Sequence, residues 1–438
     1  MRAVTIINKV LKSSRALTLL SLAICFFTVN TLMFFESDPR PHYIFLYPLM
    51  LIVIAAVAVE YCRNRGGLHI EGLSVTAKIS TVLWVITVVM LVVSEFRTRE
   101  FYDGPAFLFL IPALCFLLIP RIPRGVHLMA SAILLASLPF WAAAFAFALI
   151  GHQFTSNTIA LIILSGVCGL FLMLPRISER YGFRYYPLIQ LFLLSVIYTM
   201  IRIHSRTSLL SLLILFLGLQ IYFYRHRQAI RPIWRRITAA VIAVLIILVI
   251  IAWINGNLND YWLAKDAYDF SSRRIYIWRK TLAESEWLGM GYSFYFNYYL
   301  VGPHNMYVAA LAYAGKLGLI SFILWTGFVM IQMFSEPYAL IPGETARRSS
   351  FYRVFFLVFI IGGLTEGYLF FPFYRPINLL WFCVIGDYLS RFRTPRNAAS
   401  MSPTAAPVSA TRYRKATVSL TLLTAALSIA ALAVNLTR

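Results

Sequence analysis

Long apolar runs separated by short polar stretches dominate this chain from residue 16 onward. Most runs are close to the ~20 residues that an α-helix needs to cross ~30 Å of hydrocarbon. We therefore predict an all-α polytopic membrane protein, a bundle of about 12–13 transmembrane helices with one long external loop that carries short helices. The predicted spans are 16–35, 42–61, 74–94, 106–120, 126–150, 157–174, 185–203, 207–224, 236–255, 306–333, 351–370, 376–390 and 417–436.

The predicted division of the chain follows a change in composition after residue 390. Residues 1–390 hold all but the last of the predicted spans, together with the long loop over 255–305. The Pro-, Ser- and Ala-rich stretch over 391–416 predicts a cytoplasmic linker. The run over 417–438 predicts an additional C-terminal transmembrane helix, either part of the bundle or peripheral to it.

Composition excludes a soluble globular domain. Hydrophobic residues make up 60% of the 438 positions and charged residues 13%, against roughly half and about a quarter in soluble proteins. The formal net charge of +22 agrees with topology, because short connections on one side of the predicted bundle hold most of the Lys and Arg residues. With the amino terminus in the cytoplasm, this is the positive-inside bias, and it places the loop over 255–305 on the outer face.

The outer loop over 255–305 is the longest connection within the predicted bundle and is rich in aromatic and charged residues. Long ordered loops are uncommon unless they are functional. Within the loop, Ser271 or Ser272 can cap a short helix over 274–284, which ends before Leu288-Gly289-Met290-Gly291. The loop is therefore the first place to look for chemistry.

Arg274 and Trp278 lie four residues apart, on one face of the predicted short helix. A guanidinium fork binds phosphate oxygens, and an indole face packs on a sugar ring. The pair suits a phosphate joined to a sugar.

His304 ends the same loop, directly before the predicted helix over 306–333. An unperturbed imidazole titrates near ~6.5, which makes it a natural general base for a hydroxyl group. The competing interpretation is a structural histidine at the membrane interface that caps this helix.

A second basic cluster lies at the outer junction of two predicted spans, with Arg202 and Arg206 at either side of His204 and Ser205. Arginines at the membrane rim are costly without an anionic partner. That partner is either a ligand or the protein itself, through Glu366 or by snorkelling. Arg375, at the outer end of another span, can join either arrangement.

We predict no metal site and no cofactor. Glu36-Ser37-Asp38 and Glu284-Ser285-Glu286 have a carboxylate-x-carboxylate form that hard cations favour. The motif is too short to be specific, and a polar turn accounts for it as well. Walker-type loops, G-x-S-x-G elbows and C-x-x-C motifs do not occur in the sequence, which argues against an ATPase, a common serine hydrolase or a redox protein.

Four motifs together resemble a known arrangement: Arg274-x-x-x-Trp278, Leu288-Gly289-x-Gly291, His304-Asn305-x-Tyr307 and Gly315-x-x-Gly318. The arrangement is similar to that of the bacterial O-antigen ligase and polymerase superfamily, over about residues 200–320. The resemblance implies a C-type glycosyltransferase of the bacterial inner membrane, with its long loop and active site in the periplasm. Its donor would be a polysaccharide on undecaprenyl diphosphate, and its acceptor a sugar hydroxyl of lipid A-core, giving lipopolysaccharide. No nucleic acid partner is implied.

With that family in view, His304 and Arg274 are the predicted catalytic residues. Arg206 and Arg274, with Arg202 or Arg375 assisting, would clamp the diphosphate and stabilise its growing charge. His304 would deprotonate the acceptor, which attacks the anomeric carbon with inversion and without a metal. Trp278 and Asn305 complete the predicted substrate-binding residues.

Three alternatives stay open. An O-antigen polymerase uses the same donor with a second lipid-linked repeat as acceptor, and a protein O-oligosaccharyltransferase uses a protein hydroxyl. A transporter of lipid-linked sugars would need ionisable residues at mid-membrane depth. The candidates for that role are Lys78, Lys316, Arg353 and Glu366, most of them near span ends.

Overall fold

The protein is an all-α polytopic membrane protein. The computed structural model describes residues 14–35, 75–98, 115–116, 119, 125–150, 157–203, 205–240, 243, 247, 274–291, 294–295, 304–335, 344–365 and 375–390. Within these ranges the chain forms helices and no strand. Besides a helical stretch over 232–240, the main helices are α2 (Ser14–Phe35), α4 (Val75–Thr98), α6 (Gly125–Leu149), α7 (Asn157–Tyr181), α8 (Tyr186–Ile203), α9 (Arg206–Arg225), the 3₁₀ turn η6 (Arg227–Ala229), α12 (Arg274–Glu284), α14 (Met306–Ser335), α15 (Glu344–Thr365) and α16 (Pro376–Ser390).

Six of the described helices are long and apolar enough to cross a membrane, namely α4, α6, α7, α8, α9 and α14. Shorter apolar segments lie in α2, α15 and α16. All nine coincide with predicted spans. The spans expected at 42–61 and 417–436, and most of those at 106–120 and 236–255, lie outside the described residues, as do the predicted linker and the C-terminal helix.

These helices are apolar on nearly every side, as expected where lipid and protein both surround a helix. Along α4, for example, Trp84 and Leu91 are buried, whereas Val82 and Val89 are exposed on the surface of the protein. In water such exposure would be unfavourable, but lipid tails cover it at no cost. Most of α7, by contrast, is buried among its neighbours.

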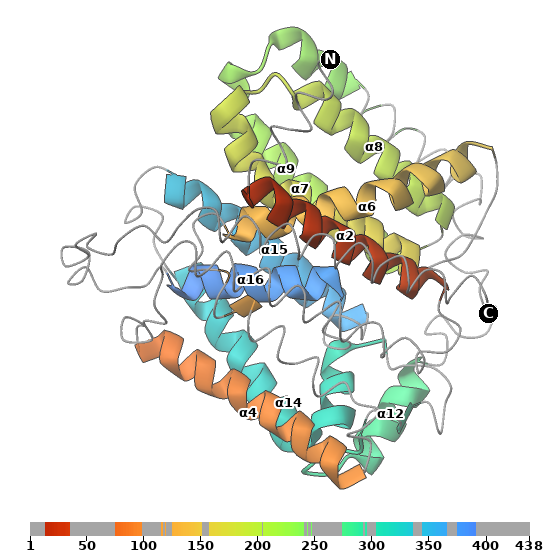
Figure 1. The fold of residues 1–438 in the computed structure, drawn as a ribbon, viewed down its shortest axis with the longest axis vertical. Coiled ribbons are helices and arrows are strands. Elements are labelled where there is room, and N and C mark those ends of the chain that lie inside the picture. Colours follow the sequence, from red (N-terminus) through yellow and green to blue (C-terminus); the bar gives the residue numbers. More distant parts are fainter. Residues whose placement is uncertain are drawn as a thin grey trace.

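The described helices form two groups joined by α15 and α16. The first group is α2, α6, α7, α8 and α9, and the second is the pair α4 and α14; α15 and α16 lie between them (Figure 1). In the first group, a Cβ atom on Gly169 of α7 would lie 2.5 Å from the carbonyl oxygen of Ala130 in α6. Such close backbone approach is how small residues hold membrane helices together.

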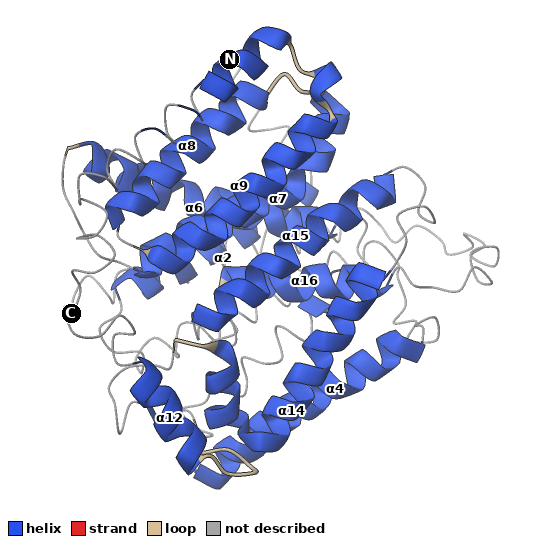
Figure 2. Ribbon diagram, turned by 180° about the vertical axis from the view of Figure 1, so that it is seen from behind, coloured by secondary structure: helices blue, strands red, loops and turns tan. Residues whose placement is uncertain are grey.

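The pair α4 and α14 is antiparallel and positions the residues discussed below. Thr87 and Ser321 share a hydrogen bond of 2.8 Å at the middle of the pair, and Ser94, one turn from the end of α4, faces residues that pack against the first half of α14. The short helix α12 lies beside this first half of α14, at the end of the pair where α4 stops (Figure 2). We call this the α12 end of the bundle.

Candidate functional site

The long helix α14 is broken at Gly315. There the backbone adopts φ 74° and ψ −175°, a conformation open almost only to glycine. The predicted motif Gly315-x-x-Gly318 therefore marks an interruption within a membrane-spanning helix. A broken helix leaves amide and carbonyl groups that cannot stay unsatisfied at membrane depth.

Residues 285–291, which we call the strap, supply the missing hydrogen bonds. The amide of Met290 donates to the carbonyl of Ala312, 2.7 Å away, before the break. After the break, the amide of Lys316 donates to the carbonyl of Glu286 at 2.9 Å. The strap thus replaces the bonds that α14 gives up, and part of the loop predicted over 255–305 is built into the bundle.

Two glycines allow the strap to approach this closely. Gly289 and Gly291 have φ values of 85° and 83°, in the left-handed region. A Cβ atom on Gly289 would lie 2.5 Å from both the carbonyl oxygen of Tyr313 and the hydroxyl of Ser94. The motif Leu288-Gly289-x-Gly291 is therefore required by close packing between the strap, α14 and α4.

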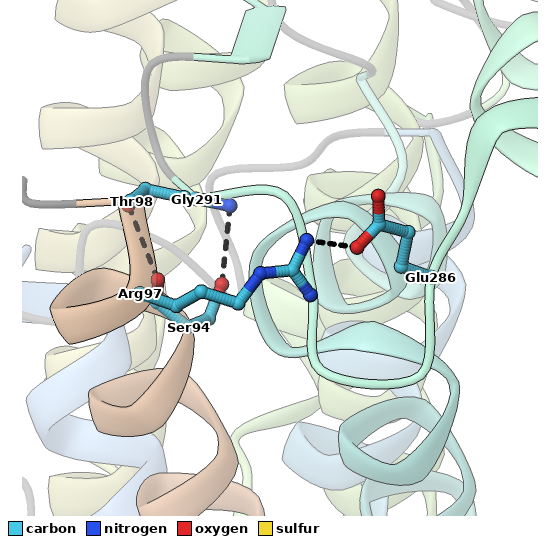
Figure 3. Close-up of polar contacts among 5 residues, drawn as sticks. All are labelled: Ser94, Arg97, Thr98, Glu286 and Gly291. Carbon is cyan, nitrogen blue, oxygen red and sulfur yellow. Dashed lines mark hydrogen bonds and ion pairs between the residues drawn. The ribbon is translucent and has the colours of Figure 1, made fainter.

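Helix α4 holds the strap from its other side, as Figure 3 shows. The hydroxyl of Ser94 accepts a hydrogen bond of 3.1 Å from the buried amide of Gly291. Arg97, one turn further, forms an ion pair with Glu286. The strap consequently bridges α4 and the break in α14.

The helix α12 is anchored to α14 by a buried tyrosine as well. Tyr295 is fully buried, and its hydroxyl lies 3.0 Å from that of Thr281 in α12. The same hydroxyl donates to the carbonyl of Val308, in the first half of α14, at 3.3 Å. Tyr295 and the strap both hold α12 near its C-terminal end.

The predicted short helix is confirmed with its predicted bounds, since α12 begins at Arg274 and ends at Glu284. Arg274 and Trp278 are both half-buried, one turn apart, while Ile277 is buried between them in sequence. The predicted caps Ser271 and Ser272 lie outside the described residues. The arginine and the indole are therefore presented by an ordered helix, at its N-terminal end.

His304 is the one described non-glycine residue with positive φ, at 48°. It is half-buried and stands just outside the first turn of α14. The neighbouring Asn305 supplies the helix cap, because its side-chain oxygen accepts hydrogen bonds from the amides of Tyr307 and Val308 at 2.9 and 3.1 Å. A capping role for His304 is thus not needed.

Asn305 also ties α14 to α15, through a 3.0 Å bond from its side-chain nitrogen to the carbonyl of Leu364. Its side chain is buried and uses both polar ends within the protein. Asn305, which the sequence predicts to bind substrate, thereby fixes the start of α14, directly after His304, against α15.

The packing of α9 against α15 places the second basic cluster, Arg202 and Arg206, at the α12 end of the bundle. Gly218 of α9 packs against Val354 of α15, and Tyr222 against Phe351, so the two helices are antiparallel. Arg206, the first residue of α9, therefore lies ~18 Å from Gly218, toward the end of α15 where Asn305 is bound.

Arg202 and Arg206 are both half-buried and lie across the junction of α8 and α9. Arg375, also half-buried, precedes α16, and its carbonyl accepts the amide of Asn378 at 2.9 Å. His204 and Glu366 are outside the described residues. The meeting of these arginines with Arg274 and His304 in one pocket stays a prediction.

The carboxylates of the second acidic motif are engaged by cations of the protein. Glu284 pairs with Lys280 at 2.7 Å along α12, and Glu286 pairs with Arg97. Across the described ranges, no group of three or more His, Cys, Asp or Glu residues has the arrangement of a metal site. Glu36 and Asp38 lie outside those ranges.

Sequence reasoning did not identify the residues that support the site, namely Ser94, Arg97, Thr281 and Tyr295. The two glycine motifs carried a signal, because closely spaced glycines indicate backbones in contact. Their partners on α4 are almost two hundred positions away in sequence, and no local pattern points to them.

The chain matches no protein-family model and no curated protein.

Proposed function

We propose that this chain is a C-type glycosyltransferase, an O-antigen ligase that transfers polysaccharide from undecaprenyl diphosphate to a sugar hydroxyl of lipid A-core. The reaction would take place at the periplasmic face of the bacterial inner membrane. The observation that carries the proposal is the helix α12, which lies beside α14, begins at Arg274 and carries Trp278 one turn further on, while His304 directly precedes α14. The motif resemblance supplies the identity of donor and acceptor.

The donor's charge would be handled by guanidinium groups. Arg274 offers a planar fork to the diphosphate, and Trp278, one turn along the same helix, offers a ring face to the adjoining sugar. Arg206, with Arg202 or Arg375, adds positive charge from the same end of the bundle. Charge grows on the leaving diphosphate as the glycosidic bond breaks, so fixed cations stabilise the transition state more than the ground state.

The acceptor would be activated by His304. Its imidazole takes the proton of the acceptor hydroxyl, whose oxygen attacks the anomeric carbon opposite the diphosphate. A new carbon–oxygen bond forms while the bond to the diphosphate breaks, and the bonding pair leaves with undecaprenyl diphosphate. Attack from the opposite face inverts the anomeric configuration.

The apolar helices suit a lipid-borne donor, because a polyprenyl tail and the exposed faces of α4 or α9 occupy the same hydrocarbon layer. The proposal therefore keeps both substrates in the membrane and brings only their polar heads to the α12 end.

The test is transfer by the purified protein in lipid vesicles that contain the lipid-linked donor and lipid A-core. We expect wild-type protein to give a product in which polymer is covalently attached to lipid A-core, and His304→Ala to give none. His226→Ala is a matched control, because that histidine bonds the carbonyl of Tyr222 at the opposite end of α9. It should retain full transfer.

Other results of this assay would indicate a different function. Lengthening of the donor without attachment to lipid A-core would indicate a polymerase, and attachment to a protein hydroxyl an oligosaccharyltransferase. Movement of donor across the vesicle membrane with no covalent product, and unaffected by His304→Ala, would replace the enzyme with a transporter.

A further inference from the structure

We propose that helix α4 positions the arginine-bearing helix α12, with Ser94 and Arg97 acting through the strap. The inference rests on the proposed function, because it concerns the placement of Arg274 for that reaction. Neither residue of α4 contacts substrate in the proposed mechanism. They are therefore positioning residues, whose effect reaches the reaction through residues 285–291.

The C-terminal end of α12 is anchored to its neighbours. Its C-terminal end leads directly into the strap, and Thr281 bonds Tyr295, which in turn bonds the carbonyl of Val308. These anchors lie in the last turn of α12 or beyond it, while Arg274 is its first residue. A displacement at these anchors would therefore be passed along the helix toward Arg274.

A helix is stiff over this length, so a tilt at its C-terminal end displaces its N-terminal end. The 11 residues of α12 give it a length of ~15 Å. A tilt of about 4° at the anchored end moves the other end by ~1 Å, and a misplacement of about 1 Å can reduce a rate on the order of 100-fold. Small changes in the strap therefore have large consequences at Arg274.

The strap needs a second support besides α14. Its bonds to Ala312, Lys316 and Leu317 run along one edge, and a segment bonded along one edge can rotate about it. The bond from Gly291 to Ser94 and the ion pair between Glu286 and Arg97 grip the other side (Figure 3). With α4 on one side and α14 on the other, the strap has a single orientation.

The ion pair separates positioning from stability. The side chains of Arg97 and Glu286 are 43% and 50% exposed, and ion pairs exposed to this degree contribute little to folding. Reversing one charge should therefore leave the protein folded. A loss of transfer in such a variant would come from the altered strap.

The experiment is a charge swap with three variants, Arg97→Glu, Glu286→Arg and both together, tested in the vesicle transfer assay. We expect each single reversal to lower the transfer rate about 10-fold or more, with the thermal midpoint within about 2 °C of wild type. The double variant restores the pair with reversed polarity and should recover at least half of the wild-type rate.

The matched control swaps an ion pair that lies within α12. Lys280 and Glu284 pair at 2.7 Å along α12, four residues apart, so both partners of this ion pair belong to one helix. Lys280→Glu, Glu284→Lys and their double variant should each keep the wild-type rate within about twofold. An equal loss in both series would overturn the inference, since any change of charge near α12 would then have the same effect.

A distance measurement tests the placement without relying on activity. Ile275 in α12 and Val89 in α4 are 48% and 46% exposed, so Ile275→Cys and Val89→Cys can carry spin labels. Arg97→Glu should shift or broaden the distance distribution between the labels, and the added Glu286→Arg should restore it. An unchanged distribution in Arg97→Glu overturns the inference.

The two proposals fail in different ways. If Arg97→Glu and Glu286→Arg keep full transfer while His304→Ala abolishes it, the positioning role is wrong and the glycosyltransferase stands. If wild-type protein makes no product but the labels move as expected, the glycosyltransferase is wrong and the mechanical link from α4 to α12 stands.

Discussion

Gly289 and Gly315 lie backbone to backbone, so close that a Cβ atom on Gly315 would overlap the amide nitrogen of Gly289. Both residues have positive φ, and the amides and carbonyls on either side of the contact bond one another. The strap and the break in α14 therefore form one unit, in which neither part can adopt its conformation without the other.

The first prediction concerns this contact. Gly315→Ala forces an alanine into a conformation that costs roughly 1–3 kcal/mol and drives its methyl group into the strap backbone, which cannot move aside cheaply. We expect a loss of at least about 2 kcal/mol in the free energy of unfolding, together with loss of transfer. Thermal unfolding of the purified protein measures the change.

The control for this variant is Gly327→Ala in the same helix, where a Cβ atom would meet nothing within 4 Å. Alanine favours the helical state over glycine by roughly 1 kcal/mol. Gly327→Ala should therefore be as stable as wild type or more so. A Gly315→Ala protein with the same midpoint as Gly327→Ala would contradict the close contact.

The sequence predicts the described helices well because each leaves a local signal. Hydrophobic runs identify the spans, and a serine pair before Arg274 and a glycine-containing segment after Glu284 mark the bounds of α12. What the sequence does not predict is the course of the chain after Glu284. The strap returns to α14 through contacts with Ala312 and Lys316, which depend on how the bundle packs.

A local sequence pattern also could not show which of the two residues before α14 caps the helix. His304 and Asn305 are both polar residues directly before a helix, and either can cap it. The structure assigns the cap to Asn305. Its second bond, to Leu364, involves a residue 59 positions away, and only tertiary structure shows it.

The second prediction tests the geometry at Arg274. Arg274→Lys keeps the positive charge but removes the planar fork, so the diphosphate keeps an ion partner and loses a paired contact. We expect transfer to fall about tenfold or more. The assay should compare it with Arg279→Lys, an exposed change on the same helix, which should be silent. Equal rates in the two variants would mean that charge alone is enough.

The third prediction concerns chelation. In the proposed mechanism guanidinium groups carry the charge that a divalent cation carries in other transferases, so EDTA should leave the rate of transfer unchanged. The carboxylates of Glu284 and Glu286 already pair with Lys280 and Arg97. Inhibition that added Mg²⁺ or Mn²⁺ reverses would instead assign a metal role to Glu36 and Asp38.

The fourth prediction separates the two roles of Asn305, the helix cap and the bond to α15. Asn305→Ala removes the helix cap and the bond to Leu364, and cap loss alone costs roughly 0.5–2 kcal/mol. Asn305→Asp keeps an oxygen for the amides of Tyr307 and Val308 but cannot donate to the carbonyl of Leu364 while ionised. We expect both variants to be less stable than wild type, with Asn305→Asp the milder of the two at low ionic strength. If Asn305→Ala and Asn305→Asp unfold at the same midpoint temperature, the cap contributes nothing to stability.

The last prediction uses the backbone of His304, whose φ of 48° is unfavourable for any residue with a side chain. Glycine accepts that conformation freely, although it loses more backbone entropy on folding. His304→Gly should therefore be as stable as wild type within about 1 kcal/mol, and more stable than His304→Ala, which keeps the strain. Both variants lack the imidazole, so both should lose transfer by roughly 10²–10⁴-fold. Activity and stability are thus expected to separate at this position. If His304 had only a structural role, His304→Gly would keep both its fold and its activity. Transfer near the wild-type rate in that variant would show that His304 is not the general base.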